Sequence, residues 1–294
     1  MTSKQSHFRF LCTFVYVYFF AQAMSMSLLA LWLRATLQLS GAETGIVFSA
    51  NFIAAMCSQP VYGYLSDQVG MHKHVLWAVG VMCMLSGLFL VYVYGPLLKT
   101  NILAGAALGG IYLGITFIAG SYAIESYVDR IGRAYGFEYS RVRLWGSLGF
   151  ASAAFLTGRL YNVDPHINFM LASLAGLLLV LVLIQAGAGV RAQGAVPMAG
   201  SRDDLPPPKP FQARTKRVVD NHREGLTIFA PIVLIAAVAQ ISTHTTQLGA
   251  ELFFWGRLAH AILYLLGAPL VRPLAWIASV AGTVMVLGAV LHWF

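Results

Sequence analysis

The chain contains 294 residues, of which 58% are hydrophobic and only 10% are charged, and its mean hydropathy is +0.71. Water-soluble domains usually carry about 25% charged residues, so this composition excludes a soluble domain. Three cysteines are too few for a disulfide framework and lack metal-ligand spacing, so no metal site is expected. The net charge of +8 would suit nucleic-acid binding, but the positions of the basic residues explain it differently.

Long apolar stretches follow one another along the chain. A transmembrane helix needs about 20 apolar residues. Seven stretches without any charged residue reach about that length: 10–33, 44–66, 74–98, 100–124, 165–190, 225–250 and 273–294. Two more segments are apolar but interrupted: 142–160, with Arg143 near its start, and 250–270, which holds Glu251 and Arg257. Alternating barrel strands are absent, so the sequence predicts an all-α polytopic membrane protein with about nine transmembrane helices, the first retained rather than cleaved.

Lysines and arginines indicate the orientation, because the cytoplasmic loops of membrane proteins are enriched in them. With the N-terminus in the cytoplasm, 14 of these residues fall inside and 3 outside, while Arg143 and Arg257 lie within spans. We therefore expect an integral membrane protein with a cytoplasmic N-terminus and an outside C-terminus. The same bias explains the basic charge without a nucleic-acid partner.

One loop divides the predicted spans into a group of six and a group of three. Residues 191–224 carry 11 of the 30 Lys, Arg, Asp and Glu residues, together with Pro206, Pro207, Pro208 and Pro210. This composition predicts an extended, proline-rich cytoplasmic loop.

Two opposite charges lie where the fourth span ends and the fifth begins. Placing one charge in the bilayer costs roughly 2.5–3.5 kcal/mol, so Glu125 and Arg143 are functional candidates. Their helices are sequential and antiparallel, so the charges can meet, and a guanidinium can pair with a carboxylate while donating to sugar hydroxyls. Tyr122, Trp145 and Phe150 add aromatic faces that suit a pyranose ring. The alternative is that the two charges only neutralise each other.

Several short motifs surround this pair. Residues 137–146 read Phe-Glu-Tyr-Ser-Arg-Val-Arg-Leu-Trp-Gly, and residues 63–70 read Gly-Tyr-Leu-Ser-Asp-Gln-Val-Gly. Together with the motifs at 40–45, 94–98 and 109–114, they resemble the lactose permease-type oligosaccharide:proton symporters of the major facilitator superfamily. The likeness implies a transporter of a bacterial inner membrane, with small sugars and protons as substrates and no cofactor.

The resemblance also implies roles for single residues over roughly residues 8–185. Glu125 and Arg143 correspond to the sugar-binding charge pair of the family. Phe150 stands where the family has a stacking tryptophan, and Ile118 replaces an asparagine of the sugar pocket; both departures concern which sugar is bound. Trp145 is a further aromatic candidate for the substrate site. The loop motif implies gating roles, not ligand roles, for three residues: Gly63, Asp67 and Gly70.

A complete member of that family has twelve spans, and alternating access needs two halves around a midplane site. Here the resemblance ends after the sixth span, and no later residue replaces the proton-coupling groups of the second half. Residues 1–190 are therefore expected to form a six-span half transporter, which would transport only by pairing with another copy or a partner.

A second constellation follows the basic loop. Arg217, Asn221 and Glu224 are spaced i, i+4 and i+7 on one helical face, where they could bind a zwitterionic peptide. Arg257 is followed by His260 and Tyr264 at i+3 and i+7. The alternative is a solvated helix end with ordinary interhelical pairing.

These residues, with Phe-Phe-Trp-Gly-Arg-Leu-Ala-His at 253–260 and Arg-Pro-Leu-Ala-Trp at 272–276, resemble the MAPEG family of membrane proteins in eicosanoid and glutathione metabolism. The resemblance implies a four-span module at residues 172–294, trimers, and glutathione between subunits. It implies glutathione-binding roles for six residues: Arg217, Asn221, Glu224, Arg257, His260 and Tyr264. His260 departs from the usual tyrosine, and Arg272 aligns only loosely with the thiol-activating arginine, so no catalytic residue is secure.

The sixth span can belong to both modules, because it enters the cytoplasm before the basic loop at residues 191–223, as the first MAPEG helix does. The principal hypothesis is a sugar:proton symporter-type transport protein fused to a MAPEG-like module. The alternatives are a glutathione-dependent transferase or isomerase housed in residues 172–294, and a non-functional gene fusion.

Overall fold

A computed structural model describes residues 3–70, 72–194, 197–198 and 205–293, and every regular element in these ranges is a helix. The predicted all-α class is therefore confirmed. The chain divides into two compact units. Met1–Thr157 and Asn168–Leu179 form unit 1, and Gly158–Ile167 and Val180–Phe294 form unit 2.

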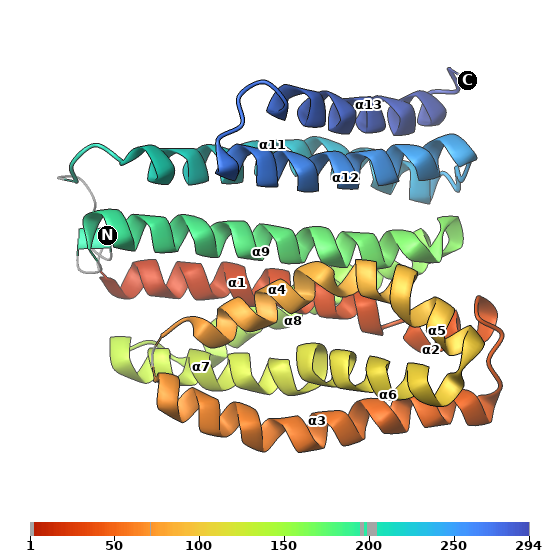
Figure 1. Cartoon of the computed structure of the whole chain (residues 1–294), viewed down its shortest axis with the longest axis horizontal. Helices are drawn as coiled ribbons and strands as arrows, with labels where there is room; N and C mark the ends of the chain where they lie inside the picture. The colour runs from red at the N-terminus through yellow and green to blue at the C-terminus, as the bar shows by residue number, and fades with distance from the viewer. Residues whose placement is uncertain (1–2, 71, 195–196, 199–204, 294) are drawn as a thin grey trace. The chain divides into compact units, whose positions relative to one another are not determined.

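The helices of unit 1 follow the predicted spans in order (Figure 1). They are α1 (Ser3–Met26), α2 (Leu29–Ala35), α3 (Gly41–Val69), α4 (His74–Leu88), η1 (Phe89–Tyr94), α5 (Gly95–Thr100), α6 (Ile102–Leu113), η2 (Gly114–Ala119) and α7 (Gly120–Tyr135). Helices α8 (Tyr139–Val163) and α9 (Pro165–Gln193) contribute residues to both units. The elements η1 and η2 are π-helical turns that interrupt the third and fourth spans.

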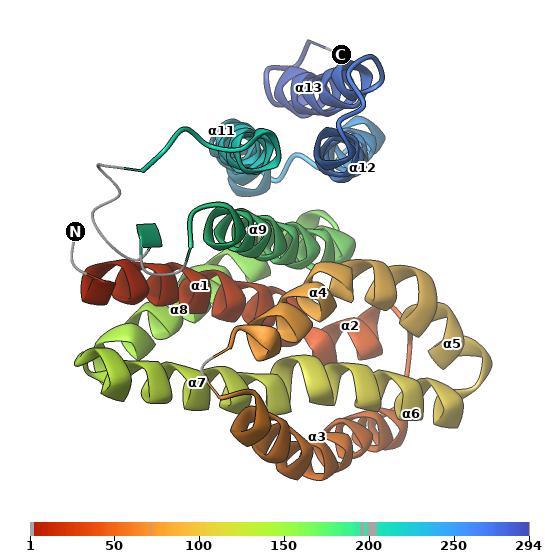
Figure 2. The ribbon, with the colours of Figure 1, turned by 60° about the vertical axis from the view of Figure 1, so that its left-hand side comes forward.

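Small residues allow close helix packing in unit 1. Helix α3 lies alongside α6 and η2 (Figure 2). A Cβ atom at Gly110 would lie 2.7 Å from the Ala50 carbonyl carbon, and one at Gly114 would lie 2.7 Å from the Asn51 carbonyl oxygen. Because larger side chains would overlap the facing backbone, glycines at these positions set the separation of the helices.

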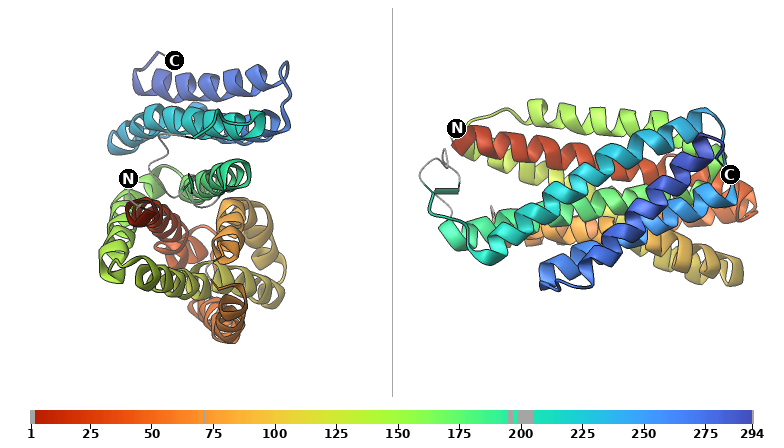
Figure 3. Two further views of the ribbon diagram at one scale, coloured as in Figure 1. Left: turned by 90° about the vertical axis from the view of Figure 1, so that its left-hand side faces the viewer. Right: turned by 90° about the horizontal axis from the view of Figure 1, so that it is seen from above.

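Unit 2 contains α11 (Pro210–Val238), α12 (His244–Leu266) and α13 (Arg272–Val290). Helices α12 and α13 run side by side (Figures 1 and 3). Gly249 and Gly282 face each other there, since a Cβ at Gly249 would lie 2.8 Å from the Gly282 carbonyl oxygen.

Five helical segments of the described residues are long and apolar enough to cross a membrane: His7–Ala35, His74–Thr100, Ile102–Tyr135, Pro165–Gln193 and Arg272–Val290. The other four predicted spans correspond to the helices α3, α8, α11 and α12, whose compositions are more polar. The chain is therefore a polytopic helical membrane protein.

Two predicted boundaries are wrong. The seventh span ends at Val238 rather than near Ala250, because Thr243 and Thr246 form a capping box that begins α12. The charged part of the basic loop is also not extended. Helix α11 begins at Pro210, and proline at the first position of a helix requires no backbone donor. Residues 195–196 and 199–204 of this loop lie outside the described residues.

Candidate functional site

Glu125 and Arg143 are in direct contact in unit 1. The Nε atom of Arg143 donates to Oε1 of Glu125 at 2.6 Å, and Nη1 donates to the Ser147 hydroxyl at 3.3 Å. The side chains of Glu125 and Arg143 are 25% and 33% exposed, so the pair is accessible to a ligand. Only the Nε edge of the guanidinium contacts the carboxylate, which is a side-on arrangement rather than an end-on fork.

A tight turn between α7 and α8 brings the pair together. Gly136 ends α7 in the left-handed conformation, with φ of 72°, which glycine adopts without a steric penalty. The Phe137 amide donates to the Gly132 carbonyl at 2.9 Å, and the Phe137 ring is buried against Phe8. Helix α8 then starts at Tyr139, so the chain returns beside α7.

Helix α1 also contacts the Arg143 guanidinium. The Arg143 guanidinium carbon lies 4.3 Å from the centre of the Phe19 ring, a cation–π contact. Gly146 and Gly149 let α8 approach α1, because a Cβ at Gly149 would overlap the Tyr16 carbonyl oxygen. The Tyr16 and Ser152 hydroxyls are hydrogen-bonded at 3.0 Å across the same contact.

The π-helical turn η2 leads directly into α7, the helix that carries Glu125. Three of its carbonyl groups accept hydrogen bonds from side chains of α1 and α3. The donors are Tyr62 to Ile115, Tyr18 to Thr116 and Gln22 to Phe117, at 3.3, 2.8 and 2.6 Å. Side chains from other helices thus bond to the irregular backbone here, and such π-bulges are frequent at functional sites.

The predicted aromatic residues are not all brought to the pair. Phe150 follows Arg143 by two helical turns and lies on about the same face of α8, 41% exposed. Trp145 lies only two residues from Arg143, which places it about 200° around the helix, on the opposite side. Ile118 is half-buried within η2. The roles of all three remain predictions.

Two contacts of the pair were not predicted. Ser147 lies one helical turn beyond Arg143, so i, i+4 spacing could have indicated it. Phe19 is distant in sequence, and no local pattern identifies it.

The predicted gating residues surround the end of α3. The Arg130 guanidinium of α7 donates to Asp67 Oδ1 at 3.1 Å and to the Ser66 carbonyl at 2.5 Å. Gly70 ends the helix with φ of 62°, where only glycine is unstrained. Gly63 is exposed on α3, and a Cβ there would meet none of the described atoms within 4 Å. Arg130 thus links α7 to the end of α3.

In unit 2, the predicted glutathione residues form two contacts between α11 and α12. Arg257, 4% exposed, donates from Nη1 to the Asn221 side-chain oxygen at 2.8 Å. Arg217 donates from Nε to the Tyr264 hydroxyl at 3.1 Å. The Arg272 guanidinium lies 4.3 Å from the centre of the Tyr264 ring, so this loosely aligned residue is near the others.

The remaining two candidates differ in environment. The buried His260 ring lies edge-on to Tyr264, with centroids 5.4 Å apart. Glu224 is exposed and lines an open surface hollow along α11 with Asp220, Arg223, Thr227 and Ile228. His222, which was not predicted, lies 5.5 Å from the His260 ring, and both of its ring nitrogens lie 2.9 Å from backbone carbonyl oxygens.

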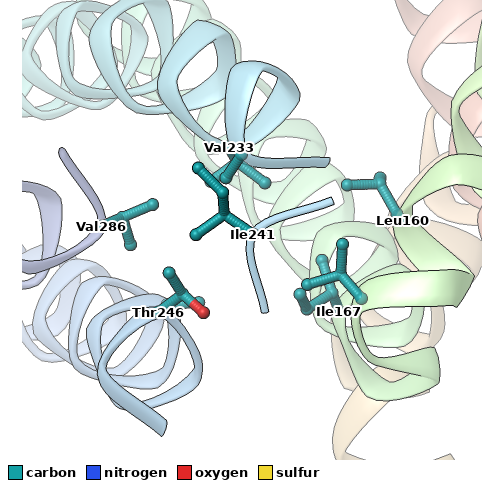
Figure 4. A pocket seen from close by; sticks show the side chains of 9 residues that line it. Leu160, Ile167, Val233, Ile241, Thr246 and Val286 are labelled. Atoms are coloured by element: carbon teal, nitrogen blue, oxygen red, sulfur yellow. The ribbon is translucent and has the colours of Figure 1, made fainter. Parts of the chain in front are cut away.

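A separate hollow in unit 2 is apolar (Figure 4). Leu160, Ile167, Val233, Ile241 and Val286 line it, and Thr246 supplies the labelled hydroxyl. Its volume of about 10 Å³ is close to the minimum for one water molecule, so it cannot hold a sugar or glutathione.

The fold and its apolar spans define an integral membrane protein with two chemically distinct groups of residues. Residues 1–204 match the model of the LacY proton/sugar symporter family, and residues 168–292 match the MAPEG family. The chain belongs to the LacY proton/sugar symporter family, and the predicted resemblance to MAPEG proteins in the C-terminal part is confirmed. Both matches include residues 168–204.

Relatives of the N-terminal part are sugar permeases. The chain is 40% identical to the raffinose permease of Escherichia coli over 185 residues, which are 63% of this chain and 44% of that protein. It is 45% identical to the lactose permease of Klebsiella oxytoca over 152 residues, which are 52% of this chain and 36% of that protein. A melibiose permease of Enterobacter cloacae is 44% identical over 164 residues, which are 56% of this chain and 39% of that protein. The chain thus spans less than half the length of these relatives.

Proposed function

We propose that unit 1 binds a small sugar through Glu125 and Arg143, as a sugar:proton symporter-type protein of a bacterial inner membrane. The observation that carries the proposal is the side-on pair, with 2.6 Å between Nε and Oε1. This geometry leaves the outer edge of the guanidinium and the second carboxylate oxygen to face sugar hydroxyls. Phe150, on about the same face as Arg143, would stack on the apolar face of the pyranose ring.

Binding of radiolabelled galactosides and sucrose to the purified full-length protein tests this proposal. The relatives are permeases named for raffinose, lactose and melibiose, which makes these sugars the first probes. We expect saturable binding that is lost in Glu125→Ala and retained in Glu138→Ala, which changes an exposed glutamate in the turn between α7 and α8. Binding to none of these sugars, or equal binding by Glu125→Ala, would remove the proposal.

Transport requires more than the six spans of this part. Alternating access needs a second half, so we propose that transport uses another copy of this chain or a partner protein. The predicted orientation, with the N-terminus in the cytoplasm and the C-terminus outside, belongs to this proposal.

A second candidate function is favoured by the contacts in unit 2. Arg217 donates to the Tyr264 hydroxyl, and the Arg272 guanidinium lies over the ring of the same tyrosine. Arg257 donates to the Asn221 side-chain oxygen. Guanidinium groups suit the carboxylates of glutathione. The module would bind glutathione, in a trimer if it assembles as MAPEG proteins commonly do, and would act as a transferase or isomerase if it also activates the thiol.

Isothermal titration of the solubilised protein with glutathione, followed by conjugation of a generic electrophile, tests this second function. Binding should be lost in Arg217→Ala and kept in Lys216→Ala, whose exposed ammonium pairs with Asp220. Conjugation at the uncatalysed rate, with glutathione bound, would leave a binding module without transferase activity.

A further inference from the structure

Helix α7 exposes a polar face although it belongs to the segment Ile102–Tyr135, which is apolar enough to cross a membrane. Its buried side chains are mainly apolar: Ala123, Ile124, Tyr127, Val128 and Ile131. Its exposed and half-buried side chains are mainly polar: Ser121, Tyr122, Glu125, Ser126, Asp129, Arg130 and Arg133. Charged residues within a membrane span face the interior of a helix bundle or a water-filled cavity. The polar face of α7 therefore suits an aqueous cavity and not the acyl chains of lipids.

Helix α3 of the same unit shows the opposite composition. The exposed side chains of its middle part include Phe52, Ile53 and Met56. Large apolar side chains of this kind suit contact with lipid. Exposure on α7 and exposure on α3 thus indicate different surroundings.

Tyr122 is the largest exposed side chain of the polar face of α7. It is 57% exposed, and its hydroxyl has no hydrogen-bond partner in the part of the chain that the structure describes. The end of α7 at Tyr135 lies about 20 Å further along the helix, so Tyr122 is deep within the span. A hydroxyl that faces acyl chains without a partner is unfavourable. The neighbour that suits this side chain is therefore a polar ligand or water.

Tyr122 also lies next to the charge pair on the same helix. It precedes Glu125 by three residues, so the two side chains are neighbours on the helix surface. Because helical side chains lean toward the N-terminus of their helix, the Glu125 carboxylate leans toward the turn that carries Tyr122. Arg143 donates to Oε1 of this carboxylate from α8. An aromatic ring, a carboxylate and a guanidinium thus border one polar face.

We propose that Tyr122 is a specificity-determining residue of the sugar site, which rests on the proposed function of unit 1. Its ring stacks on the apolar face of the sugar ring that Glu125 and Arg143 hold, and its hydroxyl forms a hydrogen bond with a hydroxyl of the same ligand. A phenol both donates and accepts, so either direction of this bond is available. A site that hydrogen-bonds a substrate hydroxyl rejects analogues that lack it, because the protein group is then left unpaired.

Equilibrium binding of radiolabelled methyl galactoside to the full-length protein tests the inference. Tyr122→Ala removes the ring and the hydroxyl, and we expect binding to be at least about tenfold weaker. Tyr122→Phe removes only the hydroxyl, and we expect binding about fivefold weaker, the typical effect of one hydrogen bond. The matched control is Tyr64→Ala, which changes a 66% exposed tyrosine of α3 and should bind like the wild type.

A series of monodeoxy galactosides tests the contact of the hydroxyl itself. For the analogue that lacks the partner hydroxyl, the loss of affinity relative to the parent sugar should be about fivefold smaller in Tyr122→Phe than in the wild type. The reason is that the variant has already lost the same hydrogen bond. A residue that is needed only for folding would change the affinity for every analogue by the same factor.

The outcomes separate the two proposals. No binding of any galactoside by the wild type would overturn the proposed function and this inference with it. Binding that depends on Glu125 but is unchanged in Tyr122→Ala would overturn this inference alone. Equal losses in the wild type and Tyr122→Phe for every deoxy analogue would also overturn it, and this comparison holds even where Tyr122→Ala does not fold.

Discussion

At the scale of single residues, the charge pair depends on the shape of the guanidinium as well as on its charge. Arg143 contacts Glu125 with Nε, Ser147 with Nη1 and Phe19 with its flat face. A lysine ammonium is a compact point charge and cannot make these three contacts together. Arg143 is therefore expected to be irreplaceable by lysine.

We predict that Arg143→Lys weakens galactoside binding by about tenfold or more, which corresponds to roughly 1.4 kcal/mol. The matched control is Arg141→Lys, which changes an exposed arginine on the same helix, 5.5 Å from the Phe8 ring. Competition binding measures the galactoside affinity of both variants. Equal affinities for Arg143→Lys and the wild type would show that charge alone is required.

His222 makes the stability of unit 2 depend on pH. Burial lowers the pKa of His222 below its usual 6.5, and its ring lies near Arg257 and His260. As the pH falls through 6.5, the unfolded chain gains a proton that the folded chain does not, so stability present above this pH is lost on acidification.

The measurement is thermal unfolding of the solubilised protein at pH 7.5 and 5.5. The unfolding temperature of the wild type should fall more between these values than that of His222→Gln, which cannot titrate. The same fall in both proteins would assign the acid sensitivity to other groups.

At the scale of elements, helix α8 contains two glycines in opposite environments. A Cβ at Gly149 would overlap the α1 backbone, whereas one at Gly158 meets none of the described atoms within 4 Å. Overpacking usually costs about 1–3 kcal/mol. Alanine in place of an unconstrained helical glycine usually stabilises by about 0.5–1 kcal/mol.

Gly149→Ala should therefore destabilise the protein, and Gly158→Ala should leave it unchanged or more stable. Unfolding of the two variants in a mixed detergent, with increasing denaturant, compares their stabilities. If Gly149→Ala is as stable as Gly158→Ala, then α1 and α8 are not in the close contact that holds Phe19 against Arg143.

The elements also show which features local sequence could predict. Charge-free intervals located the long helices, because a bilayer requires about 20 apolar residues. They misplaced the start of α12, because counting charges does not detect the capping box of Thr243 and Thr246. The meeting of Glu125 and Arg143 was predictable because the two helices that carry them are sequential and antiparallel. The contact with Phe19 and the π-helical turn η2 arise from tertiary packing and have no local signal.

At the scale of the whole molecule, one chain joins a part related to sugar permeases to a part related to MAPEG proteins. We propose that α9 serves both modules, since both family matches include residues 168–204. If the fusion is genuine, membrane extracts of the source cells should contain one intact species of 31.9 kDa that antibodies to either part detect. Two separate smaller species would instead indicate that the two parts do not function as one chain.

Hydrogen–deuterium exchange of the full-length protein with and without a galactoside tests the sugar site most directly. Ligand binding stabilises the state that binds, by about 2.7 kcal/mol at one hundred times the dissociation constant. Exchange should slow in peptides covering residues 120–150, which carry Glu125 and Arg143, and this slowing should vanish in Glu125→Gln. Slowing confined to other parts of the chain, or equal slowing in Glu125→Gln, would contradict the assignment of this pair as the sugar site.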